Sequence, residues 1–361
     1  MESYSGPPPS AARDASGGRA ERRRSKAKTV TLALQGGGAH GAFTWGVLDR
    51  LFESASLRIE AMTGTSAGAV NAAVAADGYL KGGADGARDA LDRFWRGMAH
   101  AARLSPLRPT LLDRLRRDWN MDQAPPYVAF DLMTRLLSPY QLNPLDLNPL
   151  RDLLGASIDF AALRANREIR LFATATNVET GKVRVFETHE MSVEVLLASA
   201  CLPLLFRAVE IDGEHFWDGG YMGNPAIFPL VYNCQSRDVV IVQVNPLSRP
   251  GVPTSARDIL NRINEISFNS TLMREMRAIA TVSKFINEGV LDEGRYKDVL
   301  IHLIEAEAEM QRLGASSKLN ADLDFLCYLR DLGRAAAERW LDDNFAALGE
   351  RSTVDVFERF L

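Results

Sequence analysis

The sequence is poor in the features that define several classes of protein. Its 361 residues contain only three cysteines, and none of them forms a C-x-x-C pair. This excludes a disulfide framework and a cysteine-rich zinc site, and it is typical of a reducing compartment. The longest apolar stretch, residues 196–206, is interrupted by Ser199 and Pro203. A membrane-spanning helix needs roughly 20 apolar residues, so we expect none.

A strong excess of one charge is also missing. The chain carries 42 basic and 46 acidic residues, for a net charge of −4. This balance argues against a nucleic-acid-binding protein that relies on bulk charge. No apolar segment follows the first methionine, so we expect no signal peptide and a cytoplasmic protein. Hydrophobic residues make up 46% of the chain, which is enough to build a large core.

Two regions depart from an ordinary globular pattern. Residues 1–27 are rich in Gly, Pro, Ser, Ala and Arg, which predicts a disordered basic arm. The arm is either a solvated tail or a weak contact for an anionic lipid surface. Residues 81–150 begin with a glycine-rich loop at 81–86. Within them, residues 103–120 hold five arginines and two aspartates among leucines, as in a surface helix or an amphipathic lid.

The rest of the chain alternates between strand and helix patterns. We expect strands at 29–34, 59–63, 169–175, 183–186, 207–211, 215–217, 239–244 and 299–304, and helices at 39–54, 67–79, 192–201, 256–286 and 321–349. This order predicts an α/β fold with a mainly parallel sheet and helices on both faces. One domain, residues 28–350, would include the lid-like region 81–150 and C-terminal helices at 256–350. In the helix at 256–286, an apolar stripe is expected to pack on the core: Ile259, Ile263, Ile266, Met273, Met276 and Ile279.

The first chemical motif is the glycine loop Gln35-Gly36-Gly37-Gly38-Ala39-His40-Gly41, between an expected strand and an expected helix. Glycines let the backbone approach a ligand closely, and N–H groups at a helix start can face an anion. The loop also satisfies G-x-G-x-x-G, so a dinucleotide-binding protein is a competing interpretation. That fold needs an acidic residue at the end of the second strand. Glu60 lies at the beginning of that strand instead.

The end of the second strand carries Gly64-Thr65-Ser66-Ala67-Gly68, a G-x-S-x-G element. Its position between a strand and a helix is the context that makes this motif a nucleophile elbow. The sharp turn exposes the Ser66 hydroxyl, and Gly64 and Gly68 relieve crowding on its two sides. The two loops together predict a serine nucleophile next to backbone donors for an oxyanion.

A serine nucleophile needs a base, and the sequence offers two kinds. Five histidines are present: His40, His100, His189, His215 and His302. None has the late loop position that a Ser–Asp–His order requires. The other candidate is Asp218, which follows a short expected strand and precedes Gly219 and Gly220 at a tight turn.

These motifs, in this order, resemble the patatin-like phospholipase family. The resemblance extends to the stretch from Ala198 to Pro203 and covers roughly Thr29 to Asn245. It implies a three-layer α/β/α fold and a serine–aspartate dyad without a catalytic histidine. Carried over to this sequence, Ser66 is the nucleophile and Asp218 the base. Gly36, Gly37 and Gly38 provide the oxyanion amides.

We therefore expect a serine hydrolase that cleaves lipid esters through an acyl-enzyme, with no metal or organic cofactor. Its partner is a lipid or other ester substrate, with contact to a membrane or lipid surface. No nucleic acid is expected. A polyester depolymerase would share every motif. Two alternatives come from other classes. One is a dinucleotide-binding protein that uses Gly36, Gly38 and Gly41, and the other is a non-catalytic or scaffold protein that keeps the fold. The acyl chain, the head group and the oligomeric state stay open.

Overall fold

A single sheet forms the centre of the described part of the protein. The structure is a computed structural model, which describes residues 27–105, 118–122, 124–292 and 295–361. The strands are β1 (Lys28–Leu34), β2 (Leu57–Thr65), β3 (Arg170–Asn177), β4 (Val183–Glu187), β5 (Val209–Ile211), β6 (Glu214–Asp218), β7 (Asp238–Val242) and β8 (Leu300–Ile304). Their order is β5-β6-β3-β2-β1-β7-β8, and β4 also pairs with β3. The strands from β3 to β8 along this path are parallel, whereas β4, β5 and β6 pair antiparallel.

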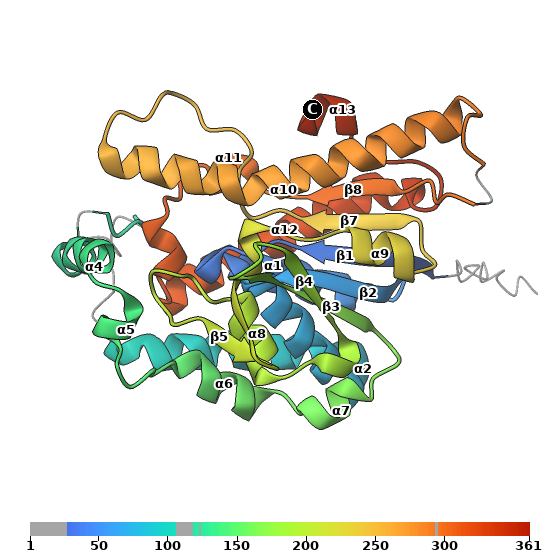
Figure 1. Cartoon of the computed structure of the whole chain (residues 1–361). Coiled ribbons are helices and arrows are strands. Elements are labelled where there is room, and N and C mark those ends of the chain that lie inside the picture. The colour runs from blue at the N-terminus through green and yellow to red at the C-terminus, as the bar shows by residue number, and fades with distance from the viewer. Residues whose placement is uncertain (1–26, 106–117, 123, 293–294) are drawn as a thin grey trace, which may run out of the picture.

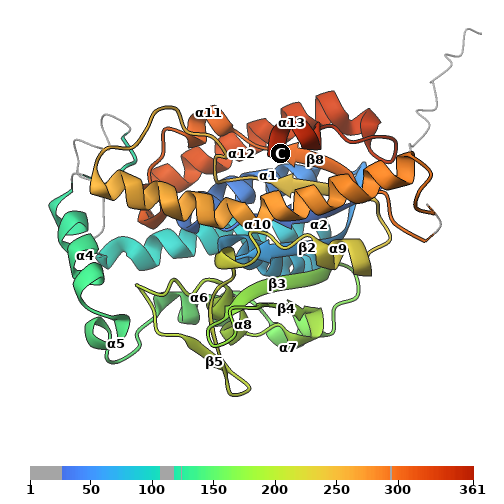
Figure 2. The same cartoon turned by 45° about the horizontal axis from the view of Figure 1, so that its top comes forward.

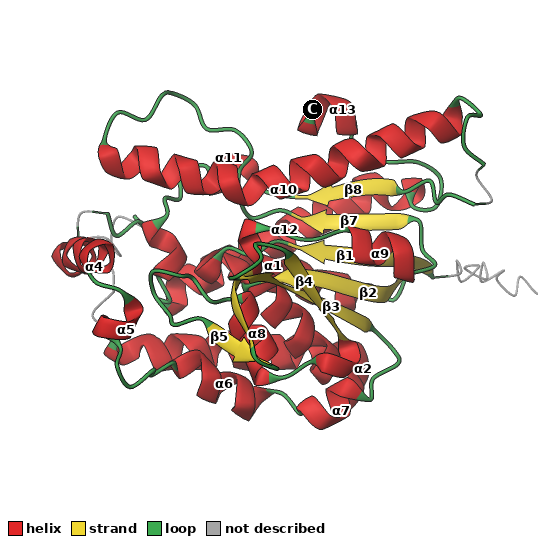
Figure 3. Cartoon of the chain, viewed as in Figure 1, coloured by secondary structure: helices red, strands yellow, loops and turns green. Residues whose placement is uncertain are grey.

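Helices cover both faces of this sheet (Figures 1 and 3). The longer ones are α1 (Gly41–Glu53), α2 (Ala67–Ala101), α4 (Pro125–Leu136), α6 (Pro149–Ser157), α10 (Ala256–Asn287) and α12 (Leu323–Asn344). The shorter ones are α5 (Pro139–Leu142), α7 (Phe160–Arg164), α8 (Val193–Ser199), α9 (Phe228–Asn233), α11 (Glu307–Met310) and α13 (Val356–Phe360). Short 3₁₀ turns include η1 (Gly38–His40), η4 (Gly219–Tyr221) and η5 (Ser316–Leu319).

Strand β1 shows why the fold has three layers. Val30, Leu32 and Leu34 point into the core that includes α1, α2, α8 and α12. Ala33 points the other way, into the core formed with α9, α10 and α13. Successive strand side chains face opposite sides, so a strand buried on both faces is apolar throughout. The expected three-layer α/β/α class with a mainly parallel sheet is confirmed.

The register of the sheet brings distant segments to one edge. Thr65 at the end of β2 pairs with Thr174 of β3, and Ala175 of β3 pairs with Asp218 at the end of β6. Leu34 at the end of β1 pairs with Gly64. The glycine loop, the turn after β2 and the turn after β6 therefore lie together at the carboxyl edge of the parallel strands, where ligands bind in open α/β sheets.

The predicted loop at 81–86 is a kink within one long helix. Helix α2 continues to Ala101, and only Gly82 and Gly83 leave helical geometry; Gly83 has φ 61°. A residue with a side chain would be strained there, so the two glycines permit the bend. Beyond the kink, Leu91 and Phe94 are buried in the core. Residues 87–101 thus belong to the body of the protein and not to a lid. Most of the arginine-rich segment 103–120, like the arm at 1–26, falls outside the described residues.

Only half of the apolar stripe on α10 packs as expected. Met276 is fully buried in the core, but Ile259, Ile263 and Ile266 are 42%, 52% and 54% exposed. The first turns of α10 extend past the edge of the sheet toward α4 (Figure 2). Helical periodicity showed that these residues share a face, but the sheet does not reach far enough to cover it.

The C-terminal helix α12 lies directly on α1. A Cβ on Gly46 of α1 would lie 1.9 Å from the Arg330 carbonyl oxygen, and one on Gly333 would lie 2.0 Å from the Phe43 carbonyl oxygen. At the opposite end, the Lys28 ammonium that opens β1 donates to the carbonyls of three residues, Phe345, Ala346 and Leu348, at 2.7–3.1 Å. Helix α12 and the segment that follows it are therefore packed against α1 and the start of β1.

Candidate active site

Ser66 stands in a strained turn between β2 and α2. Its φ of 55° and ψ of −124° are rare for a residue with a side chain. Its backbone N–H donates to the Ser199 hydroxyl at 2.9 Å, which ties the turn to the end of α8. Thr65 is buried, whereas Ser66 is partly exposed. Such strain persists only where the surroundings impose it, and it collects at functional sites.

The two glycines of the G-x-S-x-G element sit where a Cβ has no room. A Cβ on Gly64 would lie 2.5 Å from the carbonyl carbon of Gly68. One on Gly68 would lie 2.2 Å from the Leu34 carbonyl oxygen at the end of β1. Both contacts are with backbone, which cannot move aside. The glycines thus let the first turn of α2 press against the ends of β1 and β2.

Asp218 is the last residue of β6 and is 3% exposed. Its Oδ1 accepts from the Gly220 N–H at 2.7 Å, and its own N–H donates to the Cys201 carbonyl at 2.7 Å. Burial raises the pKa of Asp218 to about 7, although the Gly220 N–H, the Ser66 side chain and the Lys318 charge each lower it. The structure thus brings Ser66 and Asp218 into interaction.

Gly219 and Gly220 allow the turn after Asp218 to pack tightly. A Cβ on Gly219 would lie 2.2 Å from the Thr174 carbonyl oxygen. One on Gly220 would lie 2.2 Å from the Phe268 ring of α10. The turn is therefore held between β3 and α10.

The glycine loop requires one correction. The Gly36 N–H, expected to bind an oxyanion, donates to Asn224 Oδ1 at 2.7 Å and is buried. Gly36 instead lets the glycine loop approach Ser66 closely, because a Cβ added at Gly36 would lie 2.8 Å from the Cβ of Ser66. Gly37 is partly exposed and Gly38 exposed, and within the described residues their N–H groups have no acceptor. In the described part of the glycine loop, these two amides are therefore free to donate to a ligand.

Three polar residues to which the sequence analysis assigned no role hold the loop in place. Gln35 Oε1 accepts from the N–H groups of Val244 and Asn245, both at 3.0 Å. The Asn245 side chain donates to the Gly36 carbonyl at 2.7 Å, and Asn224 Oδ1 accepts from the Gly36 N–H. All three are buried. The partners lie about 190–210 positions apart in the chain, so no local signal indicates them.

The histidines have other partners. His40 Nε2 bonds the Ser317 hydroxyl at 2.7 Å, and burial lowers the pKa of His40 well below its usual value. His302 lies in β8 and bonds Asp238 at 2.9 Å. His215 pairs with Glu179, and His189 with Glu187, at the surface. His100 is exposed near the end of α2.

The residues of the dinucleotide alternative also have structural partners. A Cβ on Gly41 would lie 2.6 Å from that of Ala67, so Gly41 lets α1 approach α2. The Glu60 carboxylate accepts from the N–H groups of Gln235 and Ser236 at 2.6 and 2.8 Å. Both carboxylate oxygens of Glu60 thus accept from backbone N–H groups, and the residue does not lie at the carboxyl edge of the sheet.

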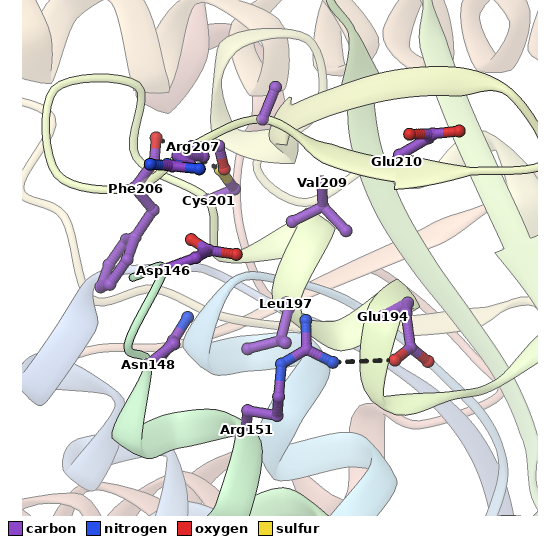
Figure 4. Close-up of a pocket in the computed structure, with 11 residues that line it drawn as sticks. Asp146, Asn148, Arg151, Glu194, Leu197, Cys201, Phe206, Arg207, Val209 and Glu210 are labelled. Atoms are coloured by element: carbon purple, nitrogen blue, oxygen red, sulfur yellow. Dashed lines mark hydrogen bonds and ion pairs between the residues drawn. The ribbon is translucent and has the colours of Figure 1, made fainter. Parts of the chain in front are cut away.

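A cavity of about 210 Å³ lies beside the segment that leads from α8 to β6 (Figure 4). Its walls include Leu197, Cys201 and Phe206, together with an ion pair between Arg151 and Glu194 at 2.9 Å. Neither Ser66 nor Asp218 lines it. With charged groups on its walls, it is not an acyl-chain pocket of the site at Ser66.

Comparison with known proteins places this chain in a family. The profile of the patatin-like phospholipase family matches residues 32–231, more than half of the chain. The chain therefore belongs to the patatin-like phospholipase family, a family of lipid hydrolases. No curated protein sequence gives a significant match.

Solved structures to which this chain is similar include proteins from two bacteria. VipD from Legionella pneumophila is 16% identical, with 84% of this chain and 67% of that chain covered and a TM-score of 0.32. ExoU in its complex with SpcU, from the type III secretion system of Pseudomonas aeruginosa, is 18% identical, with 93% and 75% covered and a TM-score of 0.32. At such values they say nothing further about activity. Within the described residues, no helix is both long and apolar enough to cross a bilayer.

Proposed function

We propose that this lipid hydrolase is a serine enzyme in which Ser66 is the nucleophile and Asp218 its base. The observation that carries the proposal is the sheet register, which brings the turn with the strained, partly exposed Ser66 and the buried Asp218 to one edge, where the Ser66 side chain lowers the pKa of the carboxyl. A buried carboxylate with a pKa near 7 is a stronger base than an exposed one, and it is ionised at neutral pH in a large share of molecules.

In the first half of the reaction, Asp218 accepts the Ser66 hydroxyl proton as Oγ attacks the ester carbonyl carbon. The carbonyl oxygen becomes an oxyanion and binds the N–H groups of Gly37 and Gly38. The bond between the carbonyl carbon and the alcohol oxygen then breaks. The departing oxygen takes the proton from Asp218, and the acyl group stays on Ser66. Each oxyanion donor contributes about 3 kcal/mol to the transition state.

In the second half, water replaces the alcohol. Asp218 accepts a proton from water as the water oxygen attacks the acyl carbon, and the same two amides bind the second oxyanion. The bond to Ser66 Oγ breaks, Asp218 returns the proton to Oγ, and the carboxylic acid leaves. The cycle restores both residues and needs no further reactant.

Exposed apolar side chains around the site support a substrate presented at a lipid surface. We call this set the apolar rim: Leu132, Met133 and Leu136 of α4, Tyr140, Leu145 and Leu147 of α5 and the segment after it, Leu204, Tyr221, Met222, and Ile259, Ile263 and Ile266 of α10. Exposed apolar groups that gather in this way mark interaction surfaces.

Contacts between the segments hold parts of the rim next to one another. Arg257 of α10 donates to the Asp122 carbonyl at 2.7 Å and pairs with Asp131 of α4. Arg207 donates to the Pro144 carbonyl at 2.9 Å, which joins the segment after α5 to the one containing Leu204. The Tyr221 and Phe268 rings, 5.1 Å apart, join the turn after Asp218 to α10.

The test is covalent labelling of the serine by a fluorophosphonate, with hydrolysis of phospholipid vesicles measured in parallel. We expect the wild type to be labelled on Ser66 and to release fatty acid. Ser66→Ala should lose both properties and keep its melting temperature, because an alanine is smaller at the same position. Ser56→Ala, at an exposed position in the turn before β2, is the control. Hydrolysis by Ser66→Ala at the wild-type rate would exclude this nucleophile.

The same assay separates the remaining substrate classes. Soluble short-chain esters, phospholipid vesicles and a polyester suspension are compared at equal enzyme concentration. Ser66-dependent release from the polyester but not from vesicles would favour the depolymerase interpretation.

A further inference from the structure

The end of α8 contacts both residues of the proposed dyad. Ser199 is the last residue of this helix, and its hydroxyl accepts from the Ser66 N–H at 2.9 Å. Two positions further on, the Cys201 carbonyl accepts from the Asp218 N–H at 2.7 Å. Residues 199–201 therefore join the turn that carries the nucleophile to the strand end that carries the base.

Both hydrogen bonds are made by the dyad residues themselves and not by their neighbours. The Ser66 N–H and Oγ belong to one residue, as do the Asp218 N–H and carboxylate, so a shift of either N–H displaces the reacting side chain. Other contacts hold the residues beside them. The Thr65 hydroxyl, for example, donates to the Gly223 carbonyl at 2.5 Å. The bond to Ser199 thus acts on Ser66 more directly than the contacts of the preceding residue.

The segment that makes these two bonds is itself firmly held. Residues 195–199 of α8 are at most 3% exposed. After the helix, the Cys201 N–H donates to the Ala198 carbonyl at 3.2 Å, and Cys201 Sγ donates to the Arg207 carbonyl at 3.0 Å. A buried helix end followed by a bonded turn is a rigid support for the groups attached to it.

The strained conformation of Ser66 explains why such a support is needed. Its φ of 55° is the rotation about the bond between its nitrogen and Cα. When the N–H is held by Ser199 and the next residues are held in α2, that rotation is fixed, and with it the direction of Cβ. A strained backbone persists only where its surroundings impose it. The partner of Ser199 lies 133 positions away in the chain, so the bond does not serve α8 itself.

We propose that Ser199 is a positioning residue of the active site, whose hydroxyl holds Ser66 in its strained turn and, through residues 199–201, at a fixed separation from Asp218. The inference rests on the proposed function, because it assigns Ser199 a task only if Ser66 is the nucleophile and Asp218 its base. It gives the stretch from Ala198 to Pro203 a part in arranging the two residues.

The experiment measures the rate at which a fluorophosphonate labels Ser66, together with kcat and KM on a soluble short-chain ester. Ser199→Ala removes the acceptor, and Ser199→Cys keeps a side chain of similar size with a weaker acceptor. We expect the labelling rate and kcat of Ser199→Ala to fall on the order of 10²-fold while KM stays unchanged, because the nucleophile is displaced but the substrate is still bound. Ser199→Cys should lie between Ser199→Ala and the wild type.

Ser192→Ala is the matched control, since it weakens the same helix without touching Ser66. The Ser192 hydroxyl caps α8 by accepting from the Val195 N–H at 3.2 Å. This variant should have a lower melting temperature and the labelling rate of the wild type. If it slows labelling as much as Ser199→Ala does, loosening of α8 explains the loss and the inference fails. The inference also fails if Ser199→Ala is labelled at the wild-type rate or, should that variant not fold, if Ser199→Cys is.

Two further variants test the proposed function in the same assay. Hydrolysis by Ser66→Ala at the wild-type rate, or full activity of Asp218→Asn, would remove the proposed function and the inference with it. A wild-type rate confined to the Ser199 variants would remove only the role of Ser199 and leave the dyad in place.

Discussion

The proposed catalytic cluster of Gly37, Gly38, Ser66 and Asp218 and the apolar rim are built in opposite ways. In the cluster, close backbone contacts and buried hydrogen bonds fix Ser66 and Asp218 without any substrate. In the rim, leucines and isoleucines of α4 and α10 face solvent and contribute little to folding. Under the proposed function, the chemistry depends on geometry already present, and lipid contact depends on surface left uncovered. Substitutions in the two regions should therefore affect different measurements.

The largest expected effect is that of Asp218→Asn. The amide keeps the shape of the carboxylate and can still accept from the Gly220 N–H, but it cannot take the Ser66 proton. Turnover should fall by several orders of magnitude on vesicles and on soluble esters alike. Asp85→Asn, at an exposed position, should leave both rates unchanged. A variant that keeps more than a tenth of the activity would show that another group is the base.

The same substitution should stabilise the protein above neutral pH. The pKa of Asp218 rises from 3.8 to about 7 on folding, so the folded state binds a proton more tightly than the unfolded state. The wild type should then lose stability as the pH rises from about 4 to about 7. At pH 8, Asp218→Asn should have a free energy of unfolding higher by roughly 2–4 kcal/mol. Urea unfolding at both ends of this range measures the difference, which should vanish at the acid end.

A smaller effect is expected from Gly37→Ala. The added methyl group would meet Val244 Cγ2 at 2.9 Å, a contact with a side chain that can shift, so the fold should survive. Displacement of the Gly37 N–H should cost on the order of 10²-fold in kcat. Gly155→Ala is the matched control, because its methyl group meets no atom within 4 Å. Equal kcat values for the two variants would remove Gly37 from the oxyanion site.

The smallest effect, and the one that most clearly separates the two regions, is expected from the rim. Ile263→Ser and Leu136→Ser should each lower hydrolysis of vesicles roughly tenfold, because less apolar surface enters the lipid. Their rates on a soluble short-chain ester should equal the wild-type rate. Val290→Ser, exposed beyond the other end of α10, is the control. A loss on both substrates would mean that the rim supports the catalytic cluster instead of binding lipid.

Sequence patterns predicted the parts of the site that depend on local chain geometry. A G-x-S-x-G element between a strand and a helix predicts a sharp turn because its glycines must allow close packing, and Ser66 has that strained turn. The alternating order of strands and helices predicted the mainly parallel sheet, whose register brings the turns after β2 and β6 together. The roles of Ser66 and Asp218 in catalysis stay predictions.

What the patterns missed depends on contacts between distant residues. The sequence predicts a free Gly36 N–H, but this group donates to Asn224, which lies 188 positions away in the chain. The stripe on α10 showed which residues share a face but not how far the core extends beneath it. The glycines at 82 and 83 are typical of a loop. The helix nevertheless continues beyond them, because the residues of its second half pack against the core.

The close packing of α12 on α1, together with the Lys28 ammonium on the last carbonyls, has a consequence for biosynthesis. The strand that opens the sheet is translated first, but its Lys28 partners are translated only after residue 344. Ser317, which bonds His40 at the glycine loop, also emerges late. A nascent chain can therefore display Ser66 long before its surroundings are assembled. The glycine loop therefore has its full set of contacts only after Ser317 has been translated.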